Sequence, residues 1–274
     1  MTRRALLAVC AVVACLRWTR CDEARPPTRF ATFNIRNFPQ HVRQIEGAFD
    51  EMVGLAASFI AVQEIADPVL FTHMAHARLG PSWQFAHLDT RATELNHHNG
   101  VLFDRRAWSL VATLAHDETR LGESYKPTLE VRLRPAGGGD VVRVLVVHLK
   151  SGSAYVDVRA QQLDALATII RKSPLPTIVL GDYNATGERD RARLARLARE
   201  THLEWATEAL ACSAFWSRED GCHRSRLDHV IMTAHPSRVE VRGGCAAHGC
   251  EWEASCPRYY HDVSDHCPVV VTVE

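Results

Sequence analysis

Short apolar runs rich in β-branched and aromatic residues recur along the chain and predict strands. We place them at Phe30–Ile35, Phe59–Gln63, Trp83–Leu88, Gly100–Phe103, Leu129–Leu133, Val141–His148, Thr177–Leu180, Asp228–Met232 and Val269–Val273. Longer stretches that separate apolar from polar residues with a helical period predict helices at His41–Ala57, Asp67–Arg78, Val156–Arg171 and Arg189–Glu200. Because the helices are few and several strands follow one another directly, this pattern favours an α/β fold. We expect mixed or antiparallel packed sheets with helices outside, rather than a doubly wound parallel sheet.

Two pairs of neighbouring runs predict hairpins. Gly100–Asp104 and Trp108–Leu114 are separated by a short basic link. Leu129–Arg134 and Asp140–His148 are joined by three consecutive glycines, whose permissive backbone suits a tight reversal.

Acids, amides and imidazoles stand where the apolar runs begin or end. Asn34, Glu64, His148 and Asp182 each lie near the end of a run, and Asp265-His266 lies just before the last one. A fold that collects these strand ends on one rim gathers them into one polar site. We therefore expect a single site built from residues that are far apart in the sequence.

The first residues have the pattern of an export leader. Arg3 and Arg4 precede the apolar run Ala5–Ala14, which is too short to cross a bilayer of about 30 Å as a helix. Val12–Cys15 also resembles a bacterial lipobox, in which the cysteine is lipidated, and plain cleavage nearby is the alternative. We expect residues 1–27 to be a leader with a short tether and residues 28–274 to be one catalytic domain. The protein is then exported, either secreted, periplasmic or tethered to an outer membrane through Cys15.

Net charge narrows the choice of partners. The composition is that of an ordinary globular protein, and 32 basic residues balance 32 acidic ones. Removing residues 1–14 takes away Arg3 and Arg4 and no acid, so the remaining chain is slightly acidic. Charge alone therefore does not indicate a strongly basic nucleic-acid binder. An enzyme that contacts few phosphates and carries a cation needs no basic excess, and we expect it to act as a monomer.

Cysteines also fit export. Six of the nine crowd the last quarter of the chain: Cys212, Cys222, Cys245, Cys250, Cys256 and Cys267. In an oxidising compartment we expect Cys212 to pair with Cys222, and two of Cys245, Cys250 and Cys256 to pair with each other. The alternative is a zinc site made by Cys245, His248, Cys250 and Cys256. We expect Cys267, beside His266, to be a buried free thiol.

The strand-end acids suit a hard divalent cation. Mg²⁺ prefers oxygen ligands, usually takes one or two protein carboxylates and keeps several waters. Glu64 with Asp265 fits this sparse set, and Asn34 can brace Glu64 or touch the metal. Either acid taken alone is better explained as a solvated residue at a strand end. The prediction of a metal site therefore depends on all of the polar residues together.

His266 is the candidate base. It needs an acceptor that fixes its tautomer and stabilises the imidazolium, and Asp228 at the start of a strand is the best candidate. An acid that holds a histidine, which in turn takes a proton from water, follows the logic of a triad. His229 alternates to the other face of that strand, so we expect a structural role for it.

The remaining polar residues suit a phosphoryl centre, which gathers charge on its oxygens in the transition state. Asp182 can accept a hydrogen bond from the attacking water, and Asn184 can donate one to a non-bridging oxygen. His148 can hold the phosphate or protonate the leaving oxygen.

Six short motifs in order resemble the endonuclease/exonuclease/phosphatase family, which has the deoxyribonuclease-I-like fold. They are Phe33-Asn34, Gln63-Glu64, His148–Gly152, Gly181–Asn184, Arg226–Asp228 and Ser264–Pro268. The resemblance runs from about Arg29 to the end of the chain. It implies a four-layer α/β sandwich that cleaves phosphate esters with Mg²⁺, with Mn²⁺ or Ca²⁺ as other candidate ions. It carries over as site residues Asn34, Glu64, His148, Asp182, Asn184, Asp228, Asp265 and His266.

The resemblance also bears on substrate contacts. The histidine of His148–Gly152 is similar to that of the nuclease branches. Lys126 stands where relatives often have an arginine before proline, so the contact expected there is altered. Further candidates for substrate binding are Lys150, Arg36 and Asn37.

The main hypothesis is an exported metal-dependent phosphodiesterase, most nearly a nuclease acting on DNA or RNA. The first alternative is a phosphatase or a lipid phosphodiesterase similar to a sphingomyelinase. For a lipid enzyme we expect an exposed apolar hairpin, and the sequence shows no obvious one. The second alternative is an inactive binding protein, which should lack one of Glu64, Asp182, Asp265 or His266, and none is missing.

Overall fold

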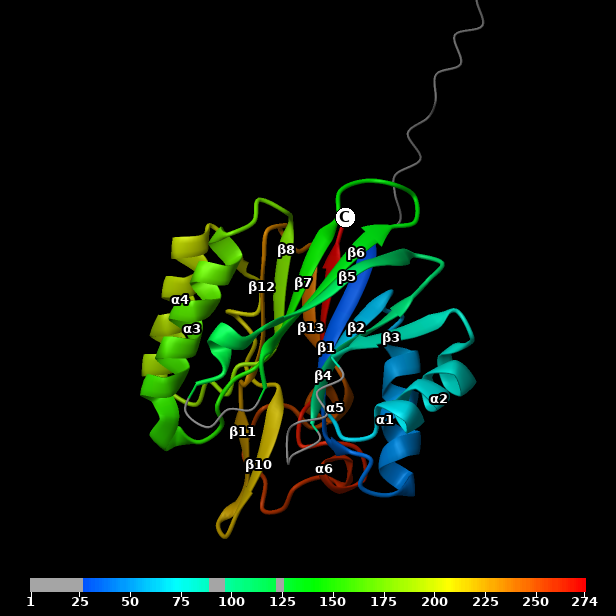
Figure 1. Ribbon diagram of the computed structural model, residues 1–274. Coiled ribbons are helices and arrows are strands. Elements are labelled where there is room, and N and C mark those ends of the chain that lie inside the picture. Colours follow the sequence, from blue (N-terminus) through cyan, green and yellow to red (C-terminus); the bar gives the residue numbers. More distant parts are fainter. Residues whose placement is uncertain (1–26, 89–96, 122–125) are drawn as a thin grey trace, which may run out of the picture.

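The apolar runs of the sequence assemble into two sheets that bury one face against each other. The computed structural model describes residues 27–88, 97–121 and 126–274, and within these ranges each main sheet has six strands. Helices cover the outer face of both sheets (Figure 1). The expected four-layer α/β sandwich with mixed sheets is therefore confirmed. Residues 1–26, with the expected leader and Cys15, lie outside the described ranges.

The first sheet has the strand order β13-β14-β1-β2-β4-β3. Its strands are β1 (Thr28–Phe38), β2 (Phe59–Ile65), β3 (Trp83–His87), β4 (His98–Asp104), β13 (Arg238–Val241) and β14 (Val269–Val273). β1 and β2 run parallel, which requires a crossover, and α1 (Val42–Gly54) supplies it. α2 (Pro68–Leu79) joins β2 to β3 and packs beside α1.

The second sheet has the order β5-β6-β7-β8-β12-β9. Its strands are β5 (Trp108–His116), β6 (Thr128–Pro135), β7 (Val142–His148), β8 (Thr177–Asp182), β9 (Glu204–Trp205) and β12 (Asp228–Met232). β7 and β8 form its parallel pair, and α3 (Val156–Arg171) is their crossover. α4 (Glu188–Thr201) packs against α3, and the short 3-10 helices Asp117–Thr119 and Ser153–Tyr155 complete this half.

A smaller layer closes one end of the sandwich. It contains the hairpin of β10 (Ala214–Arg218) and β11 (Gly221–Ser225), with the short helices α5 (Gly243–His248) and α6 (Arg258–Asp262) (Figure 1). None of these four elements was predicted from the sequence. Their apolar content is mostly cysteine and aromatic residues, which carry no strand or helix period.

The core between the sheets depends on large side chains from both. Phe30 stacks on Phe59 with ring centroids 4.8 Å apart, and Trp108 from the second sheet meets Phe59 edge-on at 5.6 Å. Burying each such side chain fully stabilises the fold by roughly 1.5–3 kcal/mol. This inner cluster fixes the spacing of the sheets and so of every residue at their edges.

One predicted hairpin is confirmed and the other is wrong. β6 and β7 pair antiparallel across the three glycines. β4 and β5, in contrast, lie in different sheets, because β4 already pairs with β2 on one edge and β3 on the other. The chain therefore crosses from one sheet to the other after Asp104, and Trp108 enters the core between them.

The cysteines form disulfides, but not in the predicted pairs. The bonds are Cys212–Cys250, Cys222–Cys256 and Cys245–Cys267. Cys212 cannot reach Cys222 because the hairpin register sets Ser217 opposite Cys222 and Ala214 opposite Ser225. Cys267 is therefore not a free thiol, and the zinc alternative is wrong because its three cysteine ligands are oxidised.

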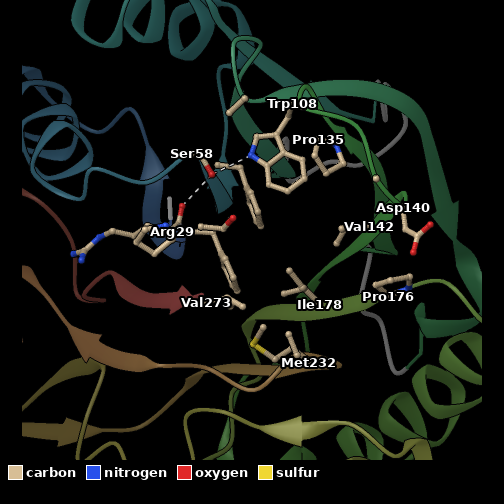
Figure 2. A pocket seen from close by; sticks show the side chains of 18 of the residues that line it. Arg29, Ser58, Trp108, Pro135, Asp140, Val142, Pro176, Ile178, Met232 and Val273 are labelled. Atoms are coloured by element: carbon tan, nitrogen blue, oxygen red, sulfur yellow. Dashed lines mark hydrogen bonds between the residues drawn. The ribbon is translucent and has the colours of Figure 1, made fainter. Parts of the chain in front are cut away.

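The end of the sandwich opposite the small layer is open. A cavity of about 550 Å³ lies there between the sheets, with Phe30, Phe59, Ile178 and Met232 in its apolar wall (Figure 2). It is lined by the first residues of β1, β2, β7 and β8, so it lies far from the polar ends of these strands. No helix in the described ranges is both long and apolar enough to cross a membrane.

Candidate active site

Two parallel strand pairs explain why distant polar residues meet. The carboxyl ends of parallel strands lie at the same edge of a sheet, so β1 and β2 bring Asn34 and Glu64 together. In the other sheet β7 and β8 do the same for His148 and Asp182, which are directly paired in the register. β12 and β14 run antiparallel to these strands, so their starting residues reach the same rim.

The backbone at this rim adopts conformations that ordinary strands avoid. Gly181 has φ +138°, and a side-chain Cβ there would lie 2.1 Å from the carbonyl oxygen of Val147. Only glycine lets β8 approach β7 so closely just before Asp182. Glu64 has φ +63° in a bulge where β2 slips its register with β4, which redirects its side chain.

Asp228 and His266 form a buried hydrogen-bonded pair. His266 Nδ1 lies 2.8 Å from Asp228 Oδ2, so the bond expected from the sequence is present. Burial alone would lower the pKa of His266, but the carboxylates of Asp228 and Asp182 raise it well above its usual value. The two carboxylates thus stabilise the imidazolium that forms when the ring takes a proton, and its Nε2 lies 3.7 Å from Asp182 Oδ2.

Ser213 holds this pair, although no pattern in the sequence predicts a role for it. Its hydroxyl lies 2.8 Å from Asp228 Oδ2 and accepts hydrogen bonds from the backbone N–H groups of Leu227 and Asp228. Ser213 follows a disulfide cysteine in a loop without periodicity, so only the folded register reveals its role. His229 points away from the rim and contacts Trp205 and Thr207, as expected for a structural residue.

Asp182 lies at the centre of the site. Its Oδ2 is 3.1 Å from Asn34 Nδ2, 3.6 Å from His148 Nε2 and 3.7 Å from His266 Nε2. Asn184 donates to both of its oxygens, from the backbone N–H at 2.8 Å and from the side-chain amide at 3.2 Å. Burial raises the pKa of Asp182 to about 7, so this carboxyl changes charge readily near neutral pH.

Glu64 is held as an ionised carboxylate. Asn34 Nδ2 donates to its Oε1 at 3.1 Å, and the backbone N–H of Asn37 donates to its Oε2 at 3.0 Å. Burial would raise the pKa of Glu64, but His148, the Lys126 ammonium and the Asn34 amide together lower it to about 2. Asn34 therefore braces Glu64 and Asp182 at once, which links the two sheets.

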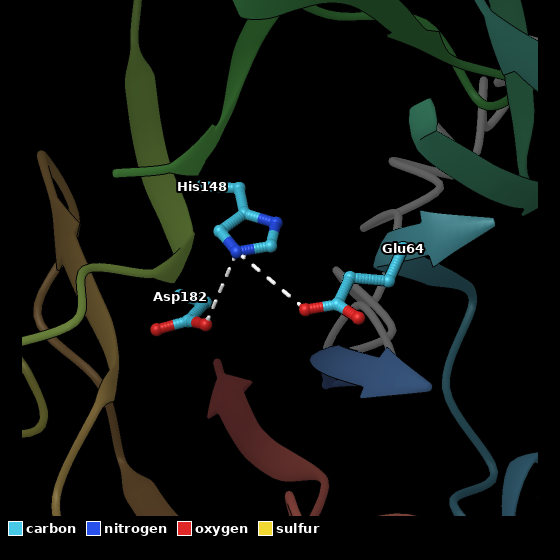
Figure 3. A group of neighbouring side chains, drawn as sticks. All are labelled: Glu64, His148 and Asp182. Carbon is cyan, nitrogen blue, oxygen red and sulfur yellow. Dashed lines mark ion pairs between the residues drawn. The ribbon is translucent and has the colours of Figure 1, made fainter. Parts of the chain in front are cut away.

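His148 and Lys126 form the opposite wall. Lys126 Nζ lies 2.9 Å from His148 Nδ1, and because an ammonium only donates, Nδ1 accepts and the ring proton sits on Nε2. That nitrogen lies 3.6 Å from both Glu64 Oε1 and Asp182 Oδ2 (Figure 3). Burial and the Lys126 charge hold the pKa of His148 well below its usual value. His148 is therefore a neutral donor that faces the acids.

Among the residues that the structure describes, two clusters of side chains have the spacing of metal ligands. Glu64, His148 and Asp182 form one, and Asp182, Asp228 and His266 form the other. Asp265 belongs to neither, and its Oδ2 instead lies 3.6 Å from Arg36 Nε. The oxygen-rich donor set and the ionised Glu64 fit a hard divalent cation better than a soft one.

The remaining predicted residues lie around this centre. Arg36 stacks over Tyr260 at 4.6 Å, and its backbone N–H donates to Asn34 Oδ1. Lys150 lies over the ring of Tyr155 at 4.5 Å. The side-chain amide of Asn184 also donates to the Leu149 carbonyl oxygen, so both of its hydrogens are used within the protein.

Comparison with known proteins agrees with this architecture. The model of the Endonuclease/Exonuclease/phosphatase family matches residues 31–266. No protein of curated function matches the sequence.

Solved structures resemble the fold along most of its length. A humanised TDP2 from D. rerio is 14% identical with a TM-score of 0.69, covering 90% of this chain and 99% of that one. The D. rerio TDP2 complexed with a single strand DNA product is 14% identical with a TM-score of 0.68, covering 91% and 99%. The human Nocturnin catalytic domain with bound sulfate is 18% identical with a TM-score of 0.65, covering 91% and 95%.

Proposed function

Because the chain belongs to the endonuclease/exonuclease/phosphatase family, we propose that it is an exported, divalent-metal-dependent phosphodiesterase that hydrolyses nucleic acid. The observation that carries the proposal is the continuous cluster from Asp228 through His266 and Asp182 to Glu64. It joins a base, a set of acids suited to a cation and a neutral imidazole donor within one rim. These are the groups that attack on a phosphate ester requires.

The base is His266, which takes a proton from the attacking water at Nε2. Asp228 holds its other nitrogen at 2.8 Å and stabilises the imidazolium as it forms. Asp182 Oδ2, 3.7 Å from Nε2, orients the same water by accepting its second proton in a hydrogen bond. Ser213 acts indirectly as a positioning residue, because it keeps Asp228 in place.

The negative charge on the phosphoryl oxygens is stabilised by groups on the other side of the site. Glu64, with Asp182 or Asp265, would hold a divalent cation, which when bound would supply Lewis-acid stabilisation of the phosphoryl oxygens. His148 presents its Nε2–H to the same space and, as a neutral imidazole, can donate a hydrogen bond to a phosphate oxygen without transferring its proton. Lys126 adds positive charge there and fixes the His148 tautomer.

Two observations support nucleic acid as substrate and export as location. TDP2, which shares the fold, is described in complex with a single strand DNA product. The three disulfides suit an oxidising compartment, which agrees with the leader pattern of residues 1–27.

A lipid phosphodiesterase is the second candidate, favoured by one feature of the small layer. Trp216 on the β10–β11 hairpin is 49% exposed, and the hairpin starts at Ala214, which bridges to His266. The sequence did not reveal this exposed tryptophan hairpin. Glu219 and Asp220 at its tip oppose insertion into a bilayer, so nucleic acid remains the proposed substrate.

The first prediction tests the chemistry with a substrate panel. Plasmid DNA, RNA, sphingomyelin and inositol phosphates are each incubated with Mg²⁺, Mn²⁺ or Ca²⁺, and with a chelator. We expect nucleic acid to be cleaved only with a divalent ion. His266→Ala and Glu64→Gln should each lower the rate by roughly 10²–10⁴, the scale of losing acid–base or electrostatic help.

Folding of both variants is checked by thermal unfolding beside Glu253→Gln, a partly exposed acid of the small layer that should keep full activity. Normal turnover by His266→Ala or Glu64→Gln rejects the assigned chemistry. Cleavage of sphingomyelin but not of DNA or RNA rejects the assigned substrate.

A further inference from the structure

Asn99 is a buried amide without a partner at the edge of the candidate active site. It is 8% exposed, and among the described residues neither its Oδ1 nor its Nδ2 has a hydrogen-bond partner. Buried amides are nearly always satisfied, because each unpaired polar atom costs free energy. An amide left unpaired at both ends therefore indicates that something outside the free protein satisfies it.

Strand geometry fixes the direction in which Asn99 points. A Cβ on the next residue, Gly100, would meet Phe85, which belongs to the outer cluster beneath α2. Asn99 alternates with Gly100 and shares its face with Val101, a member of the inner cluster between the sheets. Its amide is therefore directed into the space between the sheets.

The register places that amide beside Glu64. Val62 pairs with Gly100 and Ile65 pairs with His98, so the bulge that contains Gln63 and Glu64 lies opposite Asn99. On the inner face of β2 and β4, the apolar side chains of the core are thus followed by Gln63 and Asn99 and then by the polar rim.

Across the core, β4 packs against β6 and β7, whose rim carries Lys126 and His148. His97, two residues before Asn99, is close to the same charges. Burial lowers the pKa of His97, the Lys126 ammonium lowers it further, and Glu64 acts in the opposite direction. Asn99 therefore belongs to the wall formed by Lys126, His148 and Glu64.

We propose that Asn99 is a substrate-contacting residue whose Nδ2 donates a hydrogen bond to a phosphate oxygen of the bound nucleic acid. The inference rests on the proposed function, because it assigns a phosphate to this wall. Lys126 supplies charge there, and Asn99 supplies a directed neutral donor. Oδ1 remains available to accept from a hydroxyl or N–H group of the same nucleotide.

The unpaired state of the amide gives a sharp test. Replacing Asn99 by leucine, which has nearly the same shape, removes two unsatisfied atoms and leaves no partner unpaired. We expect Asn99→Leu to keep or raise the Tm while kcat/KM for a DNA or RNA oligonucleotide falls about 10- to 100-fold, the loss of a hydrogen bond to a charged group. Inhibition by inorganic phosphate should weaken by a similar factor.

Gln63→Leu is the matched control for stability. Gln63 is a buried amide of the neighbouring strand, but it is hydrogen-bonded to Thr32, so its replacement should lower the Tm. Asn99→Asp, which keeps an acceptor but adds a charge, should bind phosphate less well than Asn99→Leu.

The outcomes separate this inference from the proposed function. A wild-type protein that cleaves no substrate of the panel overturns both. An active wild type with Asn99→Leu retaining its kcat/KM and phosphate inhibition overturns the role of Asn99 alone. A Tm drop in Asn99→Leu as large as that in Gln63→Leu shows a structural amide and overturns it as well.

Discussion

Glu130 shows how strongly one buried charge depends on its partners. Its side chain is 1% exposed and accepts hydrogen bonds from Arg143 at 2.7 Å, Arg132 at 2.6 Å and His116 at 2.8 Å. Burial alone would raise the pKa of Glu130, but the hydrogen bonds from His116, Arg143 and Arg132 hold it well below its usual value. The carboxylate therefore stays ionised inside the second sheet, where it neutralises the equally buried Arg143.

We predict that Glu130→Gln destabilises the fold by roughly 3–5 kcal/mol, because it leaves the Arg143 charge buried without a counter-charge. Denaturant unfolding at neutral pH measures this loss. Glu200→Gln, which breaks an exposed pair with Arg196, is the control and should leave the stability nearly unchanged, because water screens that pair.

We also expect the stabilising effect of Glu130 to depend on pH. A carboxyl whose pKa is depressed on folding contributes stability above its unfolded pKa of about 4.3 and loses that contribution as the pH falls through the folded value. The difference in unfolding free energy between the wild type and Glu130→Gln should therefore become smaller below about pH 4. A gap that is absent at pH 7, or that widens in acid, contradicts this account.

Single residues also show what sequence reasoning can reach. Asp228 and His266 were paired from their positions at strand ends, and their atoms lie 2.8 Å apart. The Lys126–His148 contact and the Ser213 hydroxyl were not foreseen as parts of the site's hydrogen bonding. They depend on loops whose path no periodicity determines, and such contacts become visible only when tertiary packing sets the register.

At the scale of elements, two similar β-α-β units carry the site. β1-α1-β2 and β7-α3-β8 each place a pair of polar residues at the carboxyl end of parallel strands. Their strands were predictable because buried parallel strands have continuous apolar runs. The β4–β5 connection was not, since a short turn between two strands looks the same whether it closes a hairpin or crosses between sheets.

The elements of the small layer could not be predicted for a different reason. Disulfide bonds stabilise this layer in place of a conventional apolar core. Phe215 and Tyr259 pack among the six bonded cysteines, and Cys245–Cys267 ties α5 to the residue after His266. The sequence spacing of the cysteines predicts that neighbouring cysteines form disulfides. The register of the β10–β11 hairpin instead determines which cysteines are close enough to bond.

We predict that the double variant Cys245→Ser/Cys267→Ser loses stability and catalysis together. Cys245 and Cys267 are separated by 22 residues, so removing the cross-link costs about 3 kcal/mol through unfolded-chain entropy. Because Cys267 follows His266 directly, its release should also displace the base and lower kcat at least ~10-fold, the scale of disturbed positioning.

Cys222→Ser/Cys256→Ser is the matched control, since its loop is of similar length but ends farther from His266. It should lose similar stability with a smaller loss of kcat, measured well below both melting temperatures. Equal losses of kcat in the two double variants would show that the small layer acts only as a general support.

At the scale of the whole molecule, the sandwich has two unlike ends. The strands that start around the apolar cavity of Figure 2 finish at the acidic rim, so one set of strands defines both ends. The cavity at the first end is apolar, and the chemistry lies at the rim instead. The catalytic groups are recognised here because charged side chains and hydrogen bonds converge on them. The size of a cavity gives no information about that convergence.

The crowding of acids at the rim predicts that a divalent cation stabilises the entire fold. Glu64 and Asp182 face one another across the two sheets, both linked to Asn34. An ion bound there only in the folded state adds about 2.7 kcal/mol when its concentration is 100 times its Kd. For a domain of this size that corresponds to a rise in Tm of about 5–10 °C.

Thermal unfolding with Mg²⁺, with Mn²⁺ and with a chelator measures the shift without any substrate. Glu64→Gln should remove most of it, because an amide is a weaker ligand than an ionised carboxylate, whereas Glu253→Gln should preserve it. A Tm that the chelator leaves unchanged, or a full shift in Glu64→Gln, would refute cation binding at this rim. The cluster would then have to be explained by hydrogen bonds alone, with Asp182 protonated between His148 and His266, as its raised pKa of about 7 permits.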